Sequence, residues 1–592
     1  MSDPLQKQEI RLKGVPASPG IVSAPGFLFQ KRELDVPMYF IQESGIDAEL
    51  ERFDNALLET RRQIQAIRSD IATHLGEDEA KIFDAHLLVL EDIALIGETH
   101  DEVRRSKYNV EFCFHQISQK YIEFFNNIDD EYLKERVNDI RDVTRRLLSN
   151  LLGHSEATIG RLPEIAAGCI LISKDLHPSD TSALHSIGLK GIITDTGGAT
   201  SHTAIMARSL ELPAVVGLHN SSDLVGERDT VLVDGYEGIV VINPSEETLA
   251  EYDAFRRRKE TVAAVFSSEI AEPGLSLDHQ HIPLMINIEG VREAEQLERL
   301  QADGVGLFRT ESILLKDNTM VPEAQQFEEY KAVIEAAKGR PIVFRTFDLG
   351  GDKLLAAAGQ QGRESNPFMG LRAIRYSLRF PEVFKTQLRA ILRSSAFGPI
   401  KIMYPMVSGL GELLEANRLL EAVKSELDSE NVSYDRNIEV GSMIEIPSAA
   451  VMSDSIAEHC SFLSIGTNDL IQYLLAVDRT NDMISDLYEP YHPAVIRTIK
   501  QIVDGAHSKG VKVSVCGEMA GDPIFSSLLI GLGVDELSVA PSSYAEIKYL
   551  IRHLSVERAR QMADESLQLC NPIRIYQILK AFHIEIFRDI LH

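Results

Sequence analysis

The spacing of apolar residues changes three times along the chain. Residues 8–30 carry short apolar runs interrupted by ASPG, which predicts short strands. Residues 46–152 contain little proline or glycine and predict helices. The clearest helix lies in 129–153, where one stripe recurs at steps of three and four until Gly153 ends it. Its members are Leu133, Val137, Ile140, Thr144, Leu147 and Leu151.

A second helix is expected over residues 79–97, EAKIFDAHLLVLEDIALIG. Phe83, Leu87 and Leu90 fall on one face of this helix, and Glu79 and Asp84 fall elsewhere. Two amphipathic helices in one stretch of chain favour a helical bundle or a pair of helical hairpins.

From about residue 160 the pattern becomes one of short apolar strands alternating with helices, which predicts a compact α/β domain. The strands are expected at 168–173, 191–195, 213–217, 230–235 and 238–244. Residues 246–272 are then charged, have helical spacing and lack neighbouring strands. We expect this segment to be a helix connecting two domains.

The second half of the chain contains eight separate apolar runs with helical segments between them. They are residues 283–288, 304–309, 341–346, 400–405, 438–446, 462–467, 511–516 and 534–539. Eight such repeats in about 310 residues predict a (β/α)8 barrel. The fold class is therefore multidomain α/β: a helical part, an α/β domain, a linker helix and a C-terminal barrel.

Composition restricts the setting of these domains. The chain has 592 residues, 44% of them hydrophobic, and a formal net charge of -29, which argues against a surface for nucleic acid or anionic membrane. Its five cysteines are scattered and show no zinc spacing, as expected for reduced thiols. The first twenty residues lack the apolar core of a signal peptide, and no apolar run is long enough to span a membrane, so a cytoplasmic location is expected.

Polar residues stand where several predicted barrel strands end. Catalytic groups in such barrels lie at the carboxyl ends of the strands. Taken singly, each residue also fits a solvated strand end or a structural ion pair, whereas five strands delivering such groups to one rim indicate a ligand site. The residues are Arg309, Arg345, Glu445, Asn468, Asp469 and Cys516.

The chemistry of these groups suggests the ligand. Arg309, Arg345, Arg372 and Arg479 suit bidentate recognition of phosphate and carboxylate, so a small polyanion is expected. The oxygen donors of Glu445 and Asp469 fit a Mg²⁺ that bridges to substrate.

Cys516 is open to two interpretations. A lone thiol at a strand end is usually a small buried apolar group. Beside arginines and a metal it could instead give or take a proton.

His202 stands where GGATSHTAIMARSLELP, residues 197–213, passes from a glycine turn into a helix. Thr200 or Ser201 can cap that helix, and the free N–H groups of its first turn favour an anion such as a phosphate on the imidazole. From these residues alone His202 is either a capping or core histidine or a nucleophile. A metal ligand is disfavoured, because no second ligand lies three or four residues on.

Long motifs resemble the phosphoenolpyruvate-utilising enzymes, and among them the enzyme I family of the bacterial phosphotransferase system. GGATSHTAIMARSLELPAVVG is similar to their phosphohistidine signature. DLIQYLLAVDRTNDMISDLYEPYHPAVI with SVCGEMAGD is similar to their second signature. ASPGI, GVGLFRTE, RTFDLGGDK and NPFMGLRAIR follow the family's order, so the resemblance covers nearly the whole chain.

The resemblance implies a role for each residue. His202 matches the phosphorylated histidine, through Nε2, and Cys516 matches the donor of a proton to enolpyruvate. Glu445 and Asp469 would hold Mg²⁺. Phosphoenolpyruvate would be bound by Arg309, Arg345, Asn468, Asp469 and Arg479, with Arg372 and Lys353 as additions.

The resemblance also implies domains and partners. Residues 1–35 and 153–245 would form a swivelling phosphohistidine domain, and 36–152 a subdomain that docks the small carrier HPr. Residues 246–272 would be the linker helix, and 273–592 the phosphoenolpyruvate-binding barrel, through which a homodimer is expected. His202 would pass its phosphoryl group to a histidine of HPr.

One residue departs from the family's pattern. The family often has threonine in a DLTPSE stretch, whereas this chain reads DLHPSD with His177. His177 is either a second titrating group near His202 or a solvated loop histidine.

Three rival assignments fit the sequence less well. A dikinase or synthase of the same superfamily should carry a nucleotide-binding domain, and the nitrogen-related paralogue an N-terminal sensory domain; neither is recognisable. A non-catalytic regulatory protein would have lost His202, Cys516 or the metal carboxylates.

Overall fold

The computed structural model divides the chain into two compact units, Met1–Glu260 and Thr261–His592. Each unit is described by itself. The structure describes residues 8–29, 34–74, 80, 82–126, 131–153, 167–176, 188–198, 201–226, 229–316, 319–350, 366–479, 481, 483–484 and 487–591.

The first unit contains an eight-stranded sheet. Its order is β1 (Ile10–Lys13), β8 (Ile239–Ile242), β7 (Thr230–Asp234), β3 (Ile21–Leu28), β4 (Ile170–Ser173), β5 (Gly191–Thr194), β6 (Ala214–Val216) and β2 (Val15–Ser18). The strands β3, β4, β5 and β6 are parallel, and the outer pairings are antiparallel. All strands expected in this part of the sequence are present.

Both faces of this sheet are buried, which explains the continuous apolar runs in its strands. Leu171 of β4 and Ile192 of β5 pack in one core with Ala204 of α9 (His202–Ser209). The residues that alternate with these along the strands, such as Ile172, pack in a second core on the opposite face of the sheet. The short helix α10 (Ser221–Leu224) follows β6.

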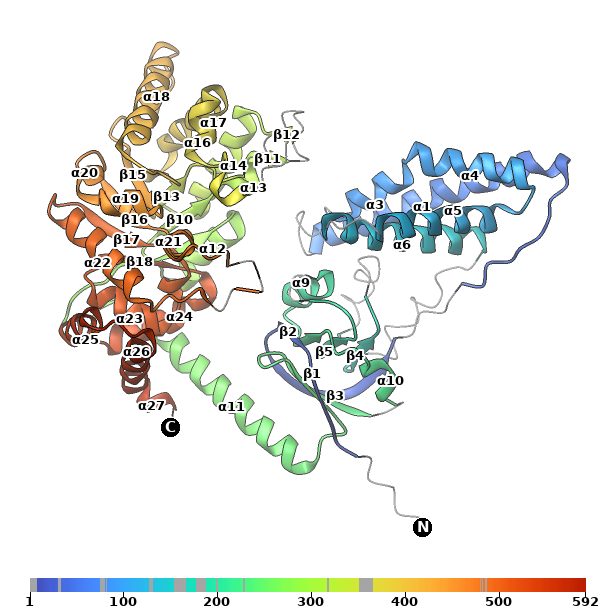
Figure 1. The fold of residues 1–592 in the computed structure, drawn as a ribbon, viewed down its shortest axis with the longest axis horizontal. Helices are drawn as coiled ribbons and strands as arrows, with labels where there is room; N and C mark the ends of the chain where they lie inside the picture. Colours follow the sequence, from blue (N-terminus) through green and yellow to red (C-terminus); the bar gives the residue numbers. More distant parts are fainter. Residues whose placement is uncertain are drawn as a thin grey trace. The chain divides into compact units, whose positions relative to one another are not determined.

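The helical part is drawn in blue and teal in Figure 1 and is labelled α1 to α6. It comprises α1 (Ile46–His74), α3 (Ile82–Leu90), α4 (Ile93–Ser106), α5 (Val110–Asn126) and α6 (Glu131–Leu151). The stripe expected on α6 is confirmed, because Val137, Ile140, Thr144, Leu147 and Leu151 are all buried. The side chain of Leu133 lies outside the described residues.

The prediction of a single helix over residues 79–97 is wrong. The chain leaves the helix at Glu91 and Asp92 and starts α4 at Ile93, because the Asp92 carboxylate accepts hydrogen bonds from the backbone N–H groups of Ala94 and Leu95. The expected burial of Phe83 and Leu90 holds.

Residues 246–269 form one long helix, α11 (Glu246–Glu269), and the boundary between the units falls within it. Its first turn is held in the first unit by Glu9, which accepts from Ser245 N and Thr248 Oγ1. Its last turn is held in the second unit, where Glu269 pairs with Arg552 and Phe266 packs against Tyr549.

The second unit is a closed barrel of eight parallel strands (Figure 1), as the sequence predicts. The strands are β9 (Leu284–Ile288), β10 (Val305–Arg309), β13 (Ile342–Arg345), β14 (Ile400–Tyr404), β15 (Glu439–Ile444), β16 (Phe462–Ile465), β17 (Lys512–Val515) and β18 (Glu536–Val539). A small hairpin, β11 (Leu315–Lys316) and β12 (Thr319–Met320), follows β10.

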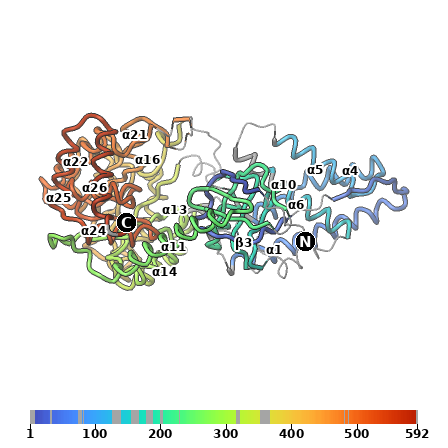
Figure 2. The backbone as a smooth tube through the Cα atoms, turned by 90° about the horizontal axis from the view of Figure 1, so that it is seen from below, coloured from blue at the N-terminus to red at the C-terminus, as the bar shows by residue number. Residues whose placement is uncertain are grey.

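Helices connect successive barrel strands, and Figure 2 labels several of them along the tube. They are α12 (Val291–Leu300), α13 (Glu311–Leu314), α14 (Glu323–Ala336), α16 (Ile374–Arg379), α17 (Pro381–Ser394), α18 (Leu410–Ser429), α19 (Pro447–Val451), α20 (Ser453–Ala457), α21 (Thr467–Leu475), α22 (Pro493–His507), α23 (Pro523–Gly531), α24 (Tyr544–His553), α25 (Val556–Gln568), α26 (Pro572–Ile586) and α27 (Arg588–Leu591).

A separate apolar cluster, made of residues from six barrel strands and their ends, closes the barrel below the rim. It comprises Leu307, Val343, Met403, Met443, Phe462 and Cys516. Phe462 fits because its neighbour on β15 is Gly441, where a Cβ would lie 2.6 Å from the ring. The barrel is therefore a packed core with chemistry confined to its ends. Among the described residues, no helix is long and apolar enough to cross a membrane.

Candidate active site

The strand ends deliver the expected groups to one end of the barrel. Arg309 and Arg345 are the last residues of β10 and β13, and Glu445 and Cys516 come directly after β15 and β17. Asn468 and Asp469 lie in the first turn of α21, just beyond β16. Because all eight strands are parallel, these side chains share the carboxyl rim.

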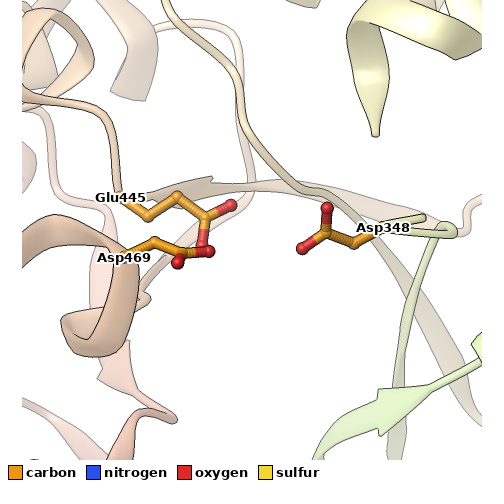
Figure 3. A group of neighbouring side chains, drawn as sticks. All are labelled: Asp348, Glu445 and Asp469. Atoms are coloured by element: carbon orange, nitrogen blue, oxygen red, sulfur yellow. The ribbon is translucent and has the colours of Figure 1, made fainter. Parts of the chain in front are cut away.

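Three carboxylates meet at this rim. Asp348, Glu445 and Asp469 each offer an oxygen within 4.8 Å of the others, and Figure 3 shows Asp348 facing the other two. Asp348 is missing from the residues expected from the sequence. The signal was present in RTFDLGGDK, which places a carboxylate three residues after Arg345 at a strand end.

The buried Arg372 and the half-buried Arg345 surround Asp348. Arg372 Nε and Nη2 donate to its two carboxylate oxygens at 2.9 and 2.8 Å, and Arg372 Nη2 also lies 3.3 Å from Asp469 Oδ2. Arg345 Nη1 is 3.5 Å from Asp348, and its Nη2 donates to Glu311 at 2.9 Å. Burial works against the charged form, but Arg345 and Arg372 outweigh it and hold the pKa of Asp348 below its ordinary value.

The surroundings of Glu445 shift its pKa in the opposite direction. Its side chain is buried, and one carboxylate oxygen accepts from Met406 N at 2.6 Å. Burial, with Asp469 and Asp348 nearby, raises the pKa of Glu445 to about 8. A divalent cation would relieve this repulsion, and carboxylate oxygens are the donors that Mg²⁺ prefers. The residues therefore fit a metal of that kind.

Cys516 is buried at the inner edge of the rim. Ser464 Oγ donates to its sulfur at 3.4 Å, and its backbone carbonyl accepts from Asn287 Nδ2 at 3.1 Å. Burial raises the pKa of the Cys516 thiol, with the Ser464 hydrogen bond and Arg345 opposing it. The group is therefore a neutral acid at pH 7. It lines a cavity of about 480 Å³ together with Arg309.

Carboxylates also hold the outer polar residues of the rim. Glu289 Oε1 accepts from Arg309 at 2.9 Å. Glu518 Oε1 accepts from Asn468 Nδ2 at 2.9 Å and from Arg479 at 3.2 Å. The sequence reasoning missed Glu289 and Glu518. The structure brings Arg372 to the cluster of three carboxylates and leaves Arg479 at the exposed margin, beside Asn468.

The loop after β17 is pressed against the start of α21. A Cβ at Gly517 would lie 2.0 Å from Thr467 Oγ1 and 2.7 Å from Thr467 N, so no other residue fits there. Cys516 is thereby held next to Asn468 and Asp469.

His202 is the first residue of α9, as expected. Ser201 caps the helix by accepting from Ala204 N at 3.4 Å, and Gly197 in the preceding turn has φ 107°. His202 and the barrel rim belong to different units. Lys353 and His177 lie outside the described residues.

Three family models match the chain. The "PEP-utilising enzyme, N-terminal" model matches residues 13–136, and the "PEP-utilising enzyme, mobile domain" model matches residues 165–238. The "PEP-utilising enzyme, PEP-binding domain" model matches residues 267–556, which include every described residue of the barrel rim.

Relatives match along the whole chain. The phosphoenolpyruvate-protein phosphotransferase of Bacillus sp. (strain S) is 40% identical over 97% of this chain and 98% of its own length. That of Bacillus subtilis (strain 168) is 40% identical over 96% and 99%. An NMR solution structure of an Enzyme I protein (nEIt) is 39% identical, covering 42% of this chain and 99% of that one with a TM-score of 0.36. The chain belongs to the phosphoenolpyruvate-protein phosphotransferase family of phosphoenolpyruvate-utilising enzymes.

Proposed function

We propose that the chain transfers the phosphoryl group of phosphoenolpyruvate to its own His202 and then to a histidine of the carrier HPr, releasing pyruvate. The observation that carries this proposal is the convergence of arginines, three carboxylates and a buried thiol at one barrel rim. The family membership agrees with it.

The arginines bind the substrate. Phosphoenolpyruvate carries a phosphate and a carboxylate, and Arg309 and Arg345, with Asn468 and Arg479, offer the donors for both. Phosphoryl transfer depends on charge neutralisation and in-line positioning, which guanidinium groups supply. Lys353 and Arg372 are further members of this site.

Glu445 and Asp469 would hold a Mg²⁺ ion, and Asp348 offers a third carboxylate oxygen within 4.8 Å of theirs. When bound, the ion neutralises charge on the transferred phosphoryl group. Arg372 keeps Asp348 charged and fixed, so the carboxylate cluster retains its shape.

Cys516 completes the reaction. The P–O bond of phosphoenolpyruvate breaks as the N–P bond to His202 Nε2 forms. The enolate left behind takes the thiol proton at its methylene carbon and becomes pyruvate. The sulfur regains a proton from solvent.

Each domain has its own role in the proposed reaction. Residues 1–35 and 153–245 carry His202, residues 36–152 dock HPr, and residues 273–592 bind phosphoenolpyruvate and form a homodimer. The helix at 246–272 lets His202 swivel between donor and acceptor. If the linker helix were made rigid and the phosphorylation rates stayed unchanged, the swivel would be excluded. The protein acts in the cytoplasm.

Labelled phosphoenolpyruvate, Mg²⁺ and purified HPr test the function. Wild type and a His219→Asn variant should label HPr, whereas His202→Ala should not. Asparagine is the control substitution because His219 has φ 68°, a region that Asn tolerates. Label on HPr with His202→Ala would refute the scheme.

A further inference from the structure

A network of buried polar side chains lies behind the end of β13. Gln387 of α17, Thr310 after β10, and Tyr330 and Gln326 of α14 are all fully buried, with 0% exposure. Gln387 lies on the apolar face of its helix, between Phe384 and Leu388. An amide in such a place destabilises the fold unless its hydrogen bonds are satisfied.

Gln387 is satisfied, and its partners lead to the rim. Its Nε2 donates to Thr310 Oγ1 at 2.9 Å and to Tyr330 Oη at 3.3 Å, and its Oε1 accepts from Phe347 N at 3.2 Å. Thr310 Oγ1 in turn donates to the carbonyl of Arg345 at 2.9 Å.

These bonds hold both sides of one short backbone segment. The Arg345 carbonyl and the Phe347 N–H are fixed by a single glutamine, directly or through Thr310. The segment carries Arg345 at one end and Asp348 at the other. Glu311 binds the same two residues from the solvent side, accepting from Arg345 Nη2 at 2.9 Å and from Asp348 N at 2.8 Å.

We infer that Gln387 is a positioning residue for the reaction. It sets the segment 345–348 so that the Arg345 guanidinium reaches the substrate phosphate while Asp348 stays against Glu445 and Asp469. It touches neither substrate nor metal. This inference rests on the proposed function and adds a buried residue of a surrounding helix to it.

A matched pair of variants tests the inference. Gln326 is an equally buried glutamine of the same network, but its partners are Tyr330 and the Val321 carbonyl, one step away from the strand end. Gln387→Met and Gln326→Met should therefore lower Tm by similar amounts. The Gln387→Met variant should raise KM for phosphoenolpyruvate and weaken Mg²⁺ binding, measured by calorimetry, by about 10-fold or more. The Gln326→Met variant should change both by less than about 2-fold.

A Thr310→Val variant keeps the inference testable if Gln387→Met fails to fold. Valine has the shape of threonine, and the substitution removes the hydrogen bond to the Arg345 carbonyl. It should reproduce the KM defect, and a double variant should be no worse than the more severe single one. Equal KM changes in the Gln387 and Gln326 variants, or a Gln387 effect on Tm alone, would overturn the inference. Absence of phosphoenolpyruvate turnover in wild type would instead refute the proposed function.

Discussion

The two ends of the barrel are built from the same strands, and both contain buried ionisable groups, yet only one end has the form of an active site. At the amino end, burial raises the pKa of Glu536 to about 7 and lowers that of Lys548. At the carboxyl end, burial raises the pKa of Glu445 to about 8. A perturbed pKa by itself does not distinguish them.

The grouping of the carboxylates distinguishes the two ends. At the amino end, Asp303 accepts from Leu284 N and Asp535 from Val513 N, each at 2.8 Å, so these carboxylates fix the starts of β9 and β17. At the carboxyl end, Asp348 binds the guanidinium of Arg372 and shares a site with Glu445 and Asp469. Pairing with backbone or with a single side chain occurs at both ends, since Asp535 also lies 2.8 Å from His507 Nε2 and Glu445 accepts from Met406 N. Three carboxylates that face one another mark the end that can take a ligand.

The largest expected effect comes from removing one glutamate at each end. Glu445→Gln should lower kcat/KM for phosphoenolpyruvate by about 1000-fold, because the metal loses a buried carboxylate. Glu536→Gln should change it by less than about 2-fold. Steady-state pyruvate formation measures both. A comparable loss in the two variants would remove the functional distinction between the ends.

The second effect concerns two cysteines. Cys516 follows β17 at the carboxyl end, and Cys460 precedes β16 at the amino end, where burial raises its thiol pKa to about 12. Cys516→Ala should slow pyruvate release by about 100-fold or more, as expected for loss of a general acid. Cys460→Ala should leave it unchanged, and stopped-flow detection of pyruvate would separate the two. Full activity of Cys516→Ala would assign the proton to another donor.

The smallest effect is on stability without metal. Both glutamates have a pKa above 4.5 in the folded protein, so each binds a proton more tightly there than in the unfolded chain. The free energy of unfolding therefore falls as pH rises above 4.5. The fall due to Glu445 ends near pH 8 and the fall due to Glu536 near pH 7, at their pKa values of about 8 and about 7. With EDTA, either Gln variant should reduce the fall in Tm between about pH 5 and about pH 8.5 by a few degrees.

Adding Mg²⁺ should then distinguish the two glutamates by their effect on Tm. At about pH 8.5 it should raise the Tm of wild type and Glu536→Gln but not of Glu445→Gln. Equal responses in both variants would place the metal elsewhere.

The sequence predicted the eight barrel strands well, because strands buried on both faces contain continuous apolar runs such as Ile342 to Phe344. It also predicted the rim residues that end a strand or follow one directly. The break between α3 and α4 escaped it, because Asp92 caps a helix within a run whose apolar residues continue on either side.

Two site features were missed for a different reason. Asp348 lies beyond its strand end, and its role follows from Arg372, which is 24 residues away in sequence. Gln387 is a polar residue within an apolar stripe, which is a signal, but its partners lie on two other segments. Each residue has a local signal, but the contacts with distant segments that give it a role leave no pattern in the sequence.

The contact between Gly517 and Thr467 has a consequence for how this active site can change. Cys516 directly precedes Gly517, and Asp469 lies two residues after Thr467. The proposed proton donor and one proposed metal ligand therefore sit on two segments with no room for even one methyl group between them. A substitution that shifts one loop must shift the other. Substitutions on these two segments are therefore coupled to each other.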